Sequence, residues 1–336
     1  MATLRDIKGD LVEKRSANPD NPQLGDIWYR TDTGNVQLRL NLSAWATGGT
    51  MNTARELGAS IGTAHNASIV GAGYNGSTHV NNVESYDGTS WTEIAEVNTA
   101  RYYCTGLGSS TAGLVAGGTP PVTSKTEIWN GSSWTEVNDL TRGPSSPQAP
   151  AYMSGSGTST SGLVYAGDEG ASNKSALTES WDGTNWTEVA DLNTGRSYAA
   201  GSGTSNSSAL LISGFNWTPS LGGSPLVEQY NGSSWTEVGD VNTGRGRIAA
   251  SNFGGVSTTI AFGGSPNNST LISSNELWDG SSWTETTDLS SAKWAHFGSG
   301  TGTNALASGG ANPTSSRLAT TEEWTVAATT QKATVS

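Results

Sequence analysis

Short apolar runs recur along the chain, and each of them closes on glycine. They read SIVGAG, GLVAGG, GLVYAG, ALLISG, TIAFGG and ALASGG. Short runs that contain β-branched residues and end at glycine are typical of β-strands. Glu-x-aromatic follows each run, and in five of six units Asp-Gly or Asn-Gly comes next, a dipeptide that tolerates the positive φ of a tight hairpin. The pattern therefore predicts about four short antiparallel strands in each unit.

Tryptophan marks the period of this repeat. The residues are Trp45, Trp91, Trp134, Trp186, Trp235 and Trp283, with spacings of 46, 43, 52, 49 and 48. A polar turn with one basic residue follows each of them, at Arg55, Arg101, Arg142, Arg196, Arg245 and Lys293. We name the strands a to d: the basic residue opens a, the glycines end b, Glu-x-aromatic is c and Trp-Thr-Glu is d. Such a small sheet has two apolar faces and cannot bury both alone, which favours radial stacking with aromatic side chains between the sheets.

This order of a glycine pair, an aromatic residue and a Trp resembles the Kelch repeat. The resemblance covers residues 45–324 and recurs six times. It implies an all-β fold, a six-bladed Kelch-like β-propeller. Two features depart from the Kelch pattern: the aromatic residue before the turn is often Trp, and the glycine pair becomes Ala166-Gly167 and Ser213-Gly214 in two units.

The two ends of the repeat region have complementary deficits. The last unit, residues 293–324, has no following Gly-x-x-Trp, and Trp45 has no strands a to c before it. We therefore expect residues 43–47 to form strand d of blade six, paired with the strand that carries Trp324. The competing interpretation makes residues 324–326 the last strand d; it is less favoured because Glu-Glu-Trp324 fits the Glu-x-aromatic pattern of strand c.

Three segments follow from this reading: an N-terminal arm (1–40), the propeller (41–326) and a C-terminal tail (327–336). In the arm, residues 27–31 and 36–40 flank Asp-Thr-Gly, which predicts a small β-hairpin. A Pro- and Asn-containing linker, SANPDNPQ, precedes the hairpin.

The arm carries a second resemblance. The opening MATLRDIKGD, the linker and GDIWYRTDTGNVQLRL, leading into blades rich in NGSSWTEV, are similar to virion proteins of marine tailed phages, including cyanophages. The resemblance implies a structural component of the virion, such as a tail fibre, a tail-tip adhesin or a capsid decoration. It implies that the arm binds other virion proteins, and we expect the anchoring residues to be Ile27, Trp28 and Tyr29.

The charge of the chain disfavours several kinds of partner. The formal net charge is −12, so no excess of basic residues is available for nucleic-acid phosphates or for an anionic membrane surface. No apolar run is long enough to span a bilayer, and we expect no signal peptide because the N-terminus lacks an apolar core. Cys104 is the single cysteine, which excludes an intrachain disulfide and a cysteine-based metal site.

Repetition also separates scaffold from candidate chemistry, because a residue type that recurs in every blade is expected to be structural. Of the 23 acidic residues after position 40, 19 occupy repeat positions. The others include Asp168 and Glu169, which are adjacent, so that their side chains would diverge in an extended loop instead of forming a glycosidase pair. A copper site of the kind found in Kelch-fold oxidases needs several His and Tyr ligands and a Cys beside a Tyr. Cys104 does follow Tyr103, but a buried thiol on strand a is the simpler interpretation. We expect a non-catalytic protein without cofactor or metal; the alternative is a propeller-fold carbohydrate-active enzyme carried by the particle, and an intracellular Kelch adaptor is a third possibility.

The sequence that does not repeat lies in the b–c loops, which share one face with the d–a loops. Aromatic side chains beside Asn, Ser and Thr are typical of surfaces that bind sugars or proteins. The candidate ligand-binding residues, directed at a host-surface glycan or protein, are Phe215, Trp217, Tyr74, His79, Asp168 and Glu169. Alternatively, Trp217 folds back over the edge of its blade.

Two further expectations concern the repeat residues themselves. The repeat Trp side chains should be buried between blades, whereas Trp28 and Trp217 should be more exposed or lie at contacts with other subunits. Each basic residue that opens strand a, such as Arg101, Arg196 or Arg245, should form a salt bridge with a repeat carboxylate, since an unpaired charge between blades is costly. The alternative is a solvated ring of basic residues around the channel mouth.

Overall fold

The computed structural model describes residues 13–19, 27–143, 151–168, 174–216 and 222–333. The chain forms two compact units, one made of residues 1–44 and 325–336 and the other of residues 45–324. Within the described ranges, the regular secondary-structure elements are all β-strands. None of these residues belongs to a helix that is long and apolar enough to cross a membrane.

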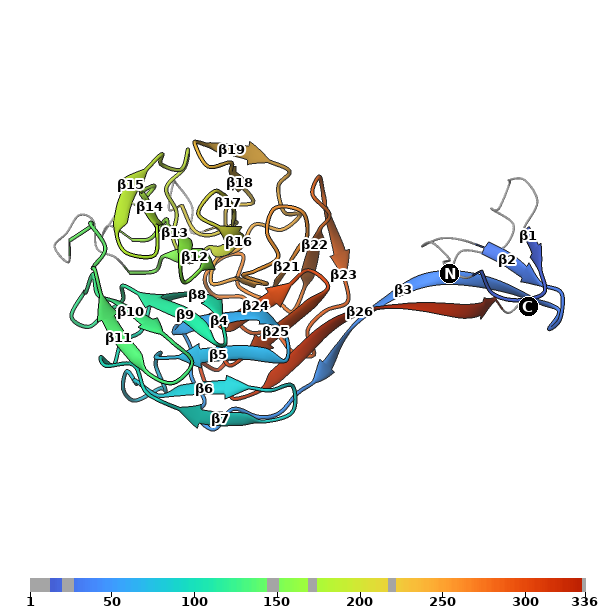
Figure 1. Cartoon of the computed structure of the whole chain (residues 1–336), viewed down its shortest axis with the longest axis horizontal. Helices are drawn as coiled ribbons and strands as arrows, with labels where there is room; N and C mark the ends of the chain where they lie inside the picture. The colour runs from blue at the N-terminus through green and yellow to red at the C-terminus, as the bar shows by residue number, and fades with distance from the viewer. Residues whose placement is uncertain (1–12, 20–26, 144–150, 169–173, 217–221, 334–336) are drawn as a thin grey trace. The chain divides into compact units, whose positions relative to one another are not determined.

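The larger unit is built from four-stranded antiparallel sheets arranged radially around a centre (Figure 1). Blade one contains β4 (Ala59–Ala64), β5 (Ala67–Gly71), β6 (Val83–Tyr86) and β7 (Trp91–Ile94). Blade two contains β8 (Thr105–Ser109), β9 (Ala112–Ala116), β10 (Thr126–Trp129) and β11 (Trp134–Val137). Blade three contains β12 (Ser154–Thr158), β13 (Ser161–Tyr165), β14 (Thr178–Trp181) and β15 (Trp186–Val189).

The remaining blades have the same order of strands. Blade four contains β16 (Ala200–Ser205), β17 (Ser208–Ile212), β18 (Val227–Tyr230) and β19 (Trp235–Val238). Blade five contains β20 (Ala249–Ala250), β21 (Thr259–Phe262), β22 (Asn275–Trp278) and β23 (Trp283–Thr286). Blade six contains β24 (Phe297–Thr301), β25 (Asn304–Ser308), β26 (Thr321–Ala333) and β3 (Asn35–Thr47). The expected Kelch-like β-propeller is confirmed, and the sheets of the described residues number six.

The ring closes through the N-terminal strand, as the sequence predicts. Strand β3 is hydrogen-bonded to β26, the strand that carries Trp324. The Gly48 N–H donates to the Thr321 carbonyl at 2.9 Å, and the Trp45 ring lies 5.5 Å from the Trp324 ring between centroids. The competing interpretation, in which residues 324–326 form strand d, is wrong because β3 occupies that place.

The smaller unit contains β1 (Glu13–Arg15), which pairs in parallel with β2 (Ile27–Arg30), and the first part of β3. β2 and β3 form the expected hairpin around a turn that ends at Gly34 (φ 68°). Residues 327–333, expected as part of a separate tail, continue β26. The expectation that Trp28 is exposed is wrong: it is 1% exposed, and its indole N–H donates to Asn18. Trp28 therefore stabilises the arm from within.

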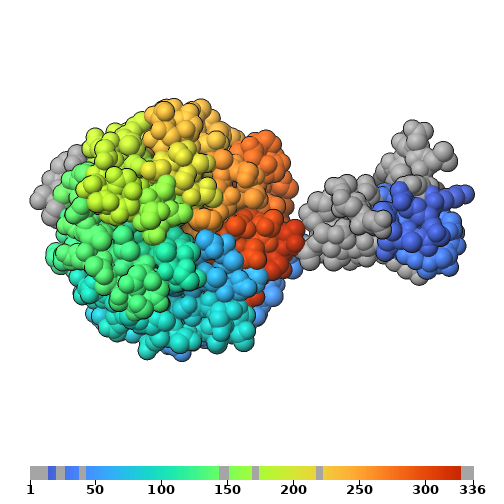
Figure 2. All heavy atoms as spheres, in the orientation of Figure 1, coloured from blue at the N-terminus to red at the C-terminus, as the bar shows by residue number. Residues whose placement is uncertain are grey.

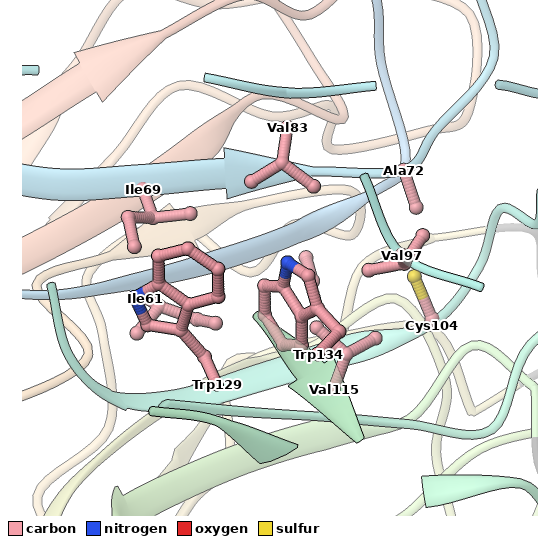
Figure 3. Close-up of a cluster of buried hydrophobic side chains, with 10 residues drawn as sticks. Ile61, Ile69, Ala72, Val83, Val97, Cys104, Val115, Trp129 and Trp134 are labelled. Carbon is pink, nitrogen blue, oxygen red and sulfur yellow. The ribbon is translucent and has the colours of Figure 1, made fainter. Parts of the chain in front are cut away.

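Tryptophan side chains fill the spaces between neighbouring blades, and Figure 2 shows the blades of the larger unit in contact around the ring. Trp129 and Trp134 of blade two pack against Ile61, Ile69 and Val83 of blade one (Figure 3). All the repeat Trp residues except Trp45, which is partly exposed, are buried, as expected.

The indole N–H of every strand-d Trp except Trp45, whose indole nitrogen has no hydrogen-bond partner among the described residues, also joins its blade to the preceding one. Trp186 of blade three donates to the Thr126 hydroxyl of blade two at 3.0 Å. Trp235 of blade four donates to Thr178 of blade three at 3.1 Å. A single side chain thus supplies both the apolar filling between two sheets and the hydrogen bond that fixes how the sheets meet.

The basic residue of every repeat forms a buried ion pair with the strand-c glutamate of its own blade. The pairs are Arg55–Glu84 at 2.8 Å, Arg101–Glu127 at 2.6 Å, Arg142–Glu179 at 2.8 Å, Arg196–Glu228 at 2.7 Å, Arg245–Glu276 at 2.8 Å and Lys293–Glu322 at 2.7 Å. The prediction of paired basic residues is confirmed, and the alternative of a solvated basic ring is wrong. These cations therefore belong to the scaffold.

The same carboxylates hold the loop that enters each blade. In blade four, Glu228 accepts the backbone N–H groups of Asn193 at 2.7 Å and Thr194 at 3.3 Å. The Asn193 amide group also reaches the Trp235 carbonyl on the outermost strand. One carboxylate thus connects the inner and outer edges of the blade.

Removal of one interblade Trp should destabilise the whole propeller. For Trp235→Ala we expect the free energy of unfolding to fall by about 3–5 kcal/mol, because a large buried side chain is lost and a cavity remains. The exposed neighbour Thr236 is the control, since its substitution by Ala should change the free energy by no more than about 0.5 kcal/mol. Denaturant titration followed by circular dichroism measures both. Equal losses in the two variants would contradict this assignment of the core.

The buried carboxylate should matter more than its cross-strand neighbour. Glu228→Gln leaves Arg196 charged and buried without a counter-ion, so we expect a loss of about 3–5 kcal/mol. Glu237 lies directly opposite Glu228 on β19 but is exposed, and Glu237→Gln should cost no more than about 0.5 kcal/mol. A loss below about 1 kcal/mol for Glu228→Gln would show that this pair does not hold the blade together.

Candidate functional site

One residue in the left-handed backbone conformation leads into the innermost strand of each blade. The six have φ between 51° and 62° and are Leu57, Tyr103, Tyr152, Tyr198, Arg247 and Ala295. Non-glycine residues rarely adopt this conformation, which costs on the order of 1–3 kcal/mol each and is concentrated at functional sites. We call this set the entry residues; they surround one mouth of the central channel.

Backbone hydrogen bonds between neighbouring entry residues hold them in place. Each bond runs from the N–H of one entry residue to the carbonyl of the entry residue in the preceding blade. The bonds are Leu57 to Ala295 at 3.1 Å, Tyr103 to Leu57 at 2.6 Å, Tyr152 to Tyr103 at 3.1 Å, Arg247 to Tyr198 at 2.8 Å and Ala295 to Arg247 at 2.9 Å. This nearly complete circle of bonds compensates for the backbone strain and fixes where the six side chains begin.

The side chains around the mouth form a continuous series of ring contacts. The centroid distances are 5.7 Å for Tyr74–Tyr102, 4.3 Å for Tyr102–Tyr103, 3.8 Å for Tyr103–Tyr152 and 4.8 Å for Tyr152–Tyr198. The Arg247 guanidinium continues the series, 5.0 Å from the Tyr198 ring and 4.2 Å from the Trp294 ring, and Arg317 lies 4.8 Å from the Tyr74 ring. All eight side chains are partly exposed, and we call them the mouth belt.

A cavity of about 120 Å³ lies at the mouth. The entry residues line it, together with Cys104, Met153, Ile248 and His296 from the start of the inner strands. A second cavity of similar volume shares several of these residues and includes Ser60, Gly155 and Asn252 farther along the inner strands. The mouth belt therefore surrounds the entrance to a hollow channel.

Burial raises the pKa of three phenol groups of the mouth belt, those of Tyr102, Tyr152 and Tyr198. Desolvation raises the pKa of Tyr152 and Tyr198 far above the ordinary value, and neighbouring phenols raise it further. The pKa of Tyr102 is also raised, chiefly by burial. A neutral phenol can both donate and accept hydrogen bonds, so the belt combines apolar faces with polar edges.

The charged groups at the mouth are few. Arg317 forms an ion pair with Glu56 at 2.6 Å. Burial raises the pKa of Glu56, and the positive charges of Arg317 and Arg247 partly oppose that rise. Arg247 forms no ion pair within the described part of the chain.

The cavity floor holds a thiol and an imidazole that are both poorly suited to nucleophilic or acid–base chemistry. Burial raises the pKa of Cys104 to about 11, so the thiol stays protonated at neutral pH, and the expectation of a buried thiol is confirmed. Burial and the nearby positive charge of Lys293 hold the pKa of His296 well below its usual value. Within the described ranges, no three His, Cys, Asp or Glu side chains are grouped closely enough to hold a metal ion.

The structure places the candidate ligand-binding residues from the sequence analysis in different surroundings. Tyr74 belongs to the mouth belt, and His79 pairs with it through a backbone bridge in the same b–c loop. Asp168 forms an ion pair with Lys174 at 2.6 Å in the b–c loop of blade three. Glu169 and Trp217 lie outside the described residues.

Phe215 is wrongly assigned as an exposed ligand-binding residue. It is 1% exposed, with its ring centroid 6.1 Å from that of Tyr198. Its backbone pairs with Ser197, and any side chain at Gly246 would overlap its ring. The pairing turns Phe215 inward, so it packs beneath the mouth belt and supports it.

Most of the mouth belt was not predicted from the sequence. In five blades the entry residue stands two positions after the repeat basic residue, and this position differs in chemistry from blade to blade: it is Leu57, Tyr103, Tyr198, Arg247 and Ala295. The repeat pattern indicates a scaffold role for the basic residue at the opening of strand a and gives no role to the residues that follow it. Variation in residue type at this fixed position is therefore the sequence signal from which the site could have been predicted. In blade three the entry residue, Tyr152, lies farther from the basic residue because of an insertion between Arg142 and strand β12.

The buried phenols should hold their protons at alkaline pH. At pH 11, above the ordinary Tyr pKa of about 10, Tyr198→Phe should leave the phenolate absorbance of the native protein unchanged. In denaturant the same variant should lose one ninth of the absorbance, because the chain has nine Tyr residues. The folded protein binds these protons more tightly than the unfolded chain, so the free energy of unfolding should fall as the pH rises above about 10. A loss of one ninth in the native protein would contradict the burial of this phenol.

Comparisons with known proteins show the fold. No family model matches the sequence, and no curated protein matches it. A solved structure titled "Structure of YjhT" is similar, with a TM-score of 0.66 and 15% sequence identity over 84% of this chain and 99% of that chain. At this identity the likeness supports the β-propeller architecture and carries no statement about activity.

Proposed function

We propose that this chain is a non-catalytic virion protein of a tailed phage, whose arm attaches it to other particle proteins and whose propeller binds a host-surface glycan or protein through the mouth belt. The observation that carries the binding role is the belt itself: eight partly exposed aromatic and guanidinium side chains in continuous contact around a cavity. Tyr, Trp and Arg are the residue types that dominate binding energy at interfaces.

The fold does not require the chemistry of the mouth belt. Blades one and six place Leu57 and Ala295 at the position that carries Tyr103, Tyr152 and Arg247 elsewhere, with the same left-handed backbone. Interactions that every blade needs are made by repeat residues, above all by the buried ion pairs. Aromatic and cationic side chains at the other entry positions therefore point to a ligand.

The distribution of ionisable groups supports a binding role over catalysis. The repeat carboxylates on strand c are each engaged by a cation and by loop amides, as Glu228 is. Asp168 is paired with Lys174, and Glu56 with Arg317. The pKa shifts of Cys104 and His296 disfavour the thiolate and the imidazolium at neutral pH.

The attachment role is proposed for the arm on the strength of its resemblance to phage virion proteins. The arm forms a compact unit with residues 325–336, and Trp28 packs inside it. Ile27 and Tyr29, on the same strand, are partly exposed and are the better candidates for contact with another particle protein.

Two experiments test the two halves of this proposal. Mass spectrometry of purified particles should find the chain in the virion, and immunogold labelling should place it on the tail or the capsid surface. Binding of the purified chain to host cells and to a glycan array should fall by tenfold or more in Tyr152→Leu, which copies the residue that blade one has at this position. The thermal midpoint should change little.

Tyr29→Ala is the matched control for the binding assay, because it removes a partly exposed tyrosine in the other unit. It should leave binding to cells and glycans intact. A chain that is missing from the particle would contradict the virion role. Turnover of a glycosidic substrate in a hydrolase screen would instead favour the alternative, a propeller-fold carbohydrate-active enzyme carried by the particle.

A further inference from the structure

Arg247 departs from the rule that the other buried or half-buried arginines of the propeller obey. Each arginine that opens a strand a has a glutamate within 2.6–2.8 Å, and Arg317 has Glu56 at 2.6 Å. Within the described residues, Arg247 has neither an ion pair nor a side-chain hydrogen bond. Arg247 is thus the cation of the mouth that lacks a counter-ion.

Ring contacts leave the hydrogen-bonding edge of Arg247 available. The guanidinium lies over the Tyr198 ring at 5.0 Å and over the Trp294 ring at 4.2 Å. Such contacts use the flat faces of the guanidinium, whereas its N–H groups lie in the plane and match the two oxygens of a carboxylate. The aromatic rings restrict the side chain before any ligand arrives, which lowers the entropy lost on binding.

The surroundings favour a small ligand with a single charge. The mouth has two guanidinium groups, Arg247 and Arg317, and one facing carboxylate, Glu56, so its local charge is positive. The whole chain has a net charge of −12, which repels a polyanion of high charge density. A carboxylate with one negative charge can use the local attraction without that repulsion.

The size of the cavity and the phenol groups around it indicate that the molecule bearing the carboxylate is a sugar. Arg247 lines the same cavity of about 120 Å³ as Tyr103, Tyr152 and Tyr198. A water molecule needs about 10–15 Å³ of such space, so the cavity can take a sugar-sized group. Neutral phenols donate and accept hydrogen bonds, as sugar hydroxyls require, and their faces can pack against a sugar ring.

We propose that Arg247 binds the carboxylate of an acidic sugar at the channel mouth, with the tyrosines of the mouth belt contacting the rest of that sugar. This inference rests on the proposed binding of a glycan by the belt and names its chemical class. The ligand is then a glycan with one uronic-acid-type unit, held through a bidentate pair between the guanidinium and the carboxylate.

The test is a titration of the full chain with galacturonic acid, its methyl ester and neutral galactose, followed by calorimetry. We expect the acid to bind at least tenfold more tightly than the ester or the neutral sugar. Arg247→Gln should lower affinity for the acid by about 10- to 100-fold, in line with a lost charge-assisted hydrogen bond. Arg247→Lys should restore part of the affinity, because it keeps the charge and loses the planar fork.

Arg30→Gln is the matched control, because it removes a guanidinium of the other unit that already has a carboxylate partner, Asp32, and it should change affinity by less than threefold. Thermal midpoints near that of the unmodified chain will confirm that the variants fold. We expect this result because two other blades have Leu57 and Ala295 at the position that Arg247 occupies. Equal affinity for acid and ester, or no effect of Arg247→Gln, would overturn the acidic-sugar proposal and leave the proposed function standing.

Failure of all three sugars to bind would overturn the acidic-sugar proposal as well. The wider binding role is judged by a separate readout, the effect of Tyr152→Leu on binding to host cells. If the unmodified chain binds host cells and Tyr152→Leu abolishes that binding, the mouth belt remains the binding surface and a different ligand class is favoured. If Tyr152→Leu leaves cell binding unchanged, that result would contradict the role of the mouth belt as the binding surface.

Discussion

A buried glutamate on the third strand of each blade accepts hydrogen bonds from the loop that enters the blade and pairs with the basic residue that ends this loop. In blade one the carboxylate of Glu84 receives Asn52, Thr53 and Arg55. A carboxylate so buried would be costly alone, and the cation would be equally costly without it. Because each needs the other, the loop cannot leave without stranding a charge, and the innermost strand starts at a fixed place in every blade.

This constraint is what makes the channel mouth available for function. Once the pair of Arg101 and Glu127 has fixed the backbone, the next residues continue into the circle of left-handed entry residues, and their side chains are free to vary. The chain uses that freedom unevenly: Leu57 and Ala295 are small or apolar, whereas Tyr103 begins the aromatic arc that ends at Arg247. A repeated scaffold and a unique surface thus occupy neighbouring positions in the same segment.

The fold was largely predictable because its causes are local and periodic. Turn dipeptides, glycine-ended strands and the position of Trp324 were enough to predict the blades and the closing strand, and the need to pair charges was enough to predict partners such as Glu228. The site was less accessible, because the mouth belt joins residues that are adjacent only after the ring closes, as Trp294 and Arg247 are. Burial also reversed two assignments: Phe215 turned inward through its pairing with Ser197, and Trp28 packed inside the arm.

Amide hydrogen exchange of the native chain tests most directly whether the buried carboxylates hold the scaffold. The N–H groups that donate to them include those of Asn52, Asn98, Asn193 and Asn242, all of which lie in loops. We predict that these amides exchange as slowly as those of the central strands. The turn amides of Ser132 and Ser233, which donate to exposed asparagines, should exchange orders of magnitude faster. Equal, fast exchange in both groups would show that the loops open independently of the blades and would contradict the role assigned to the carboxylates.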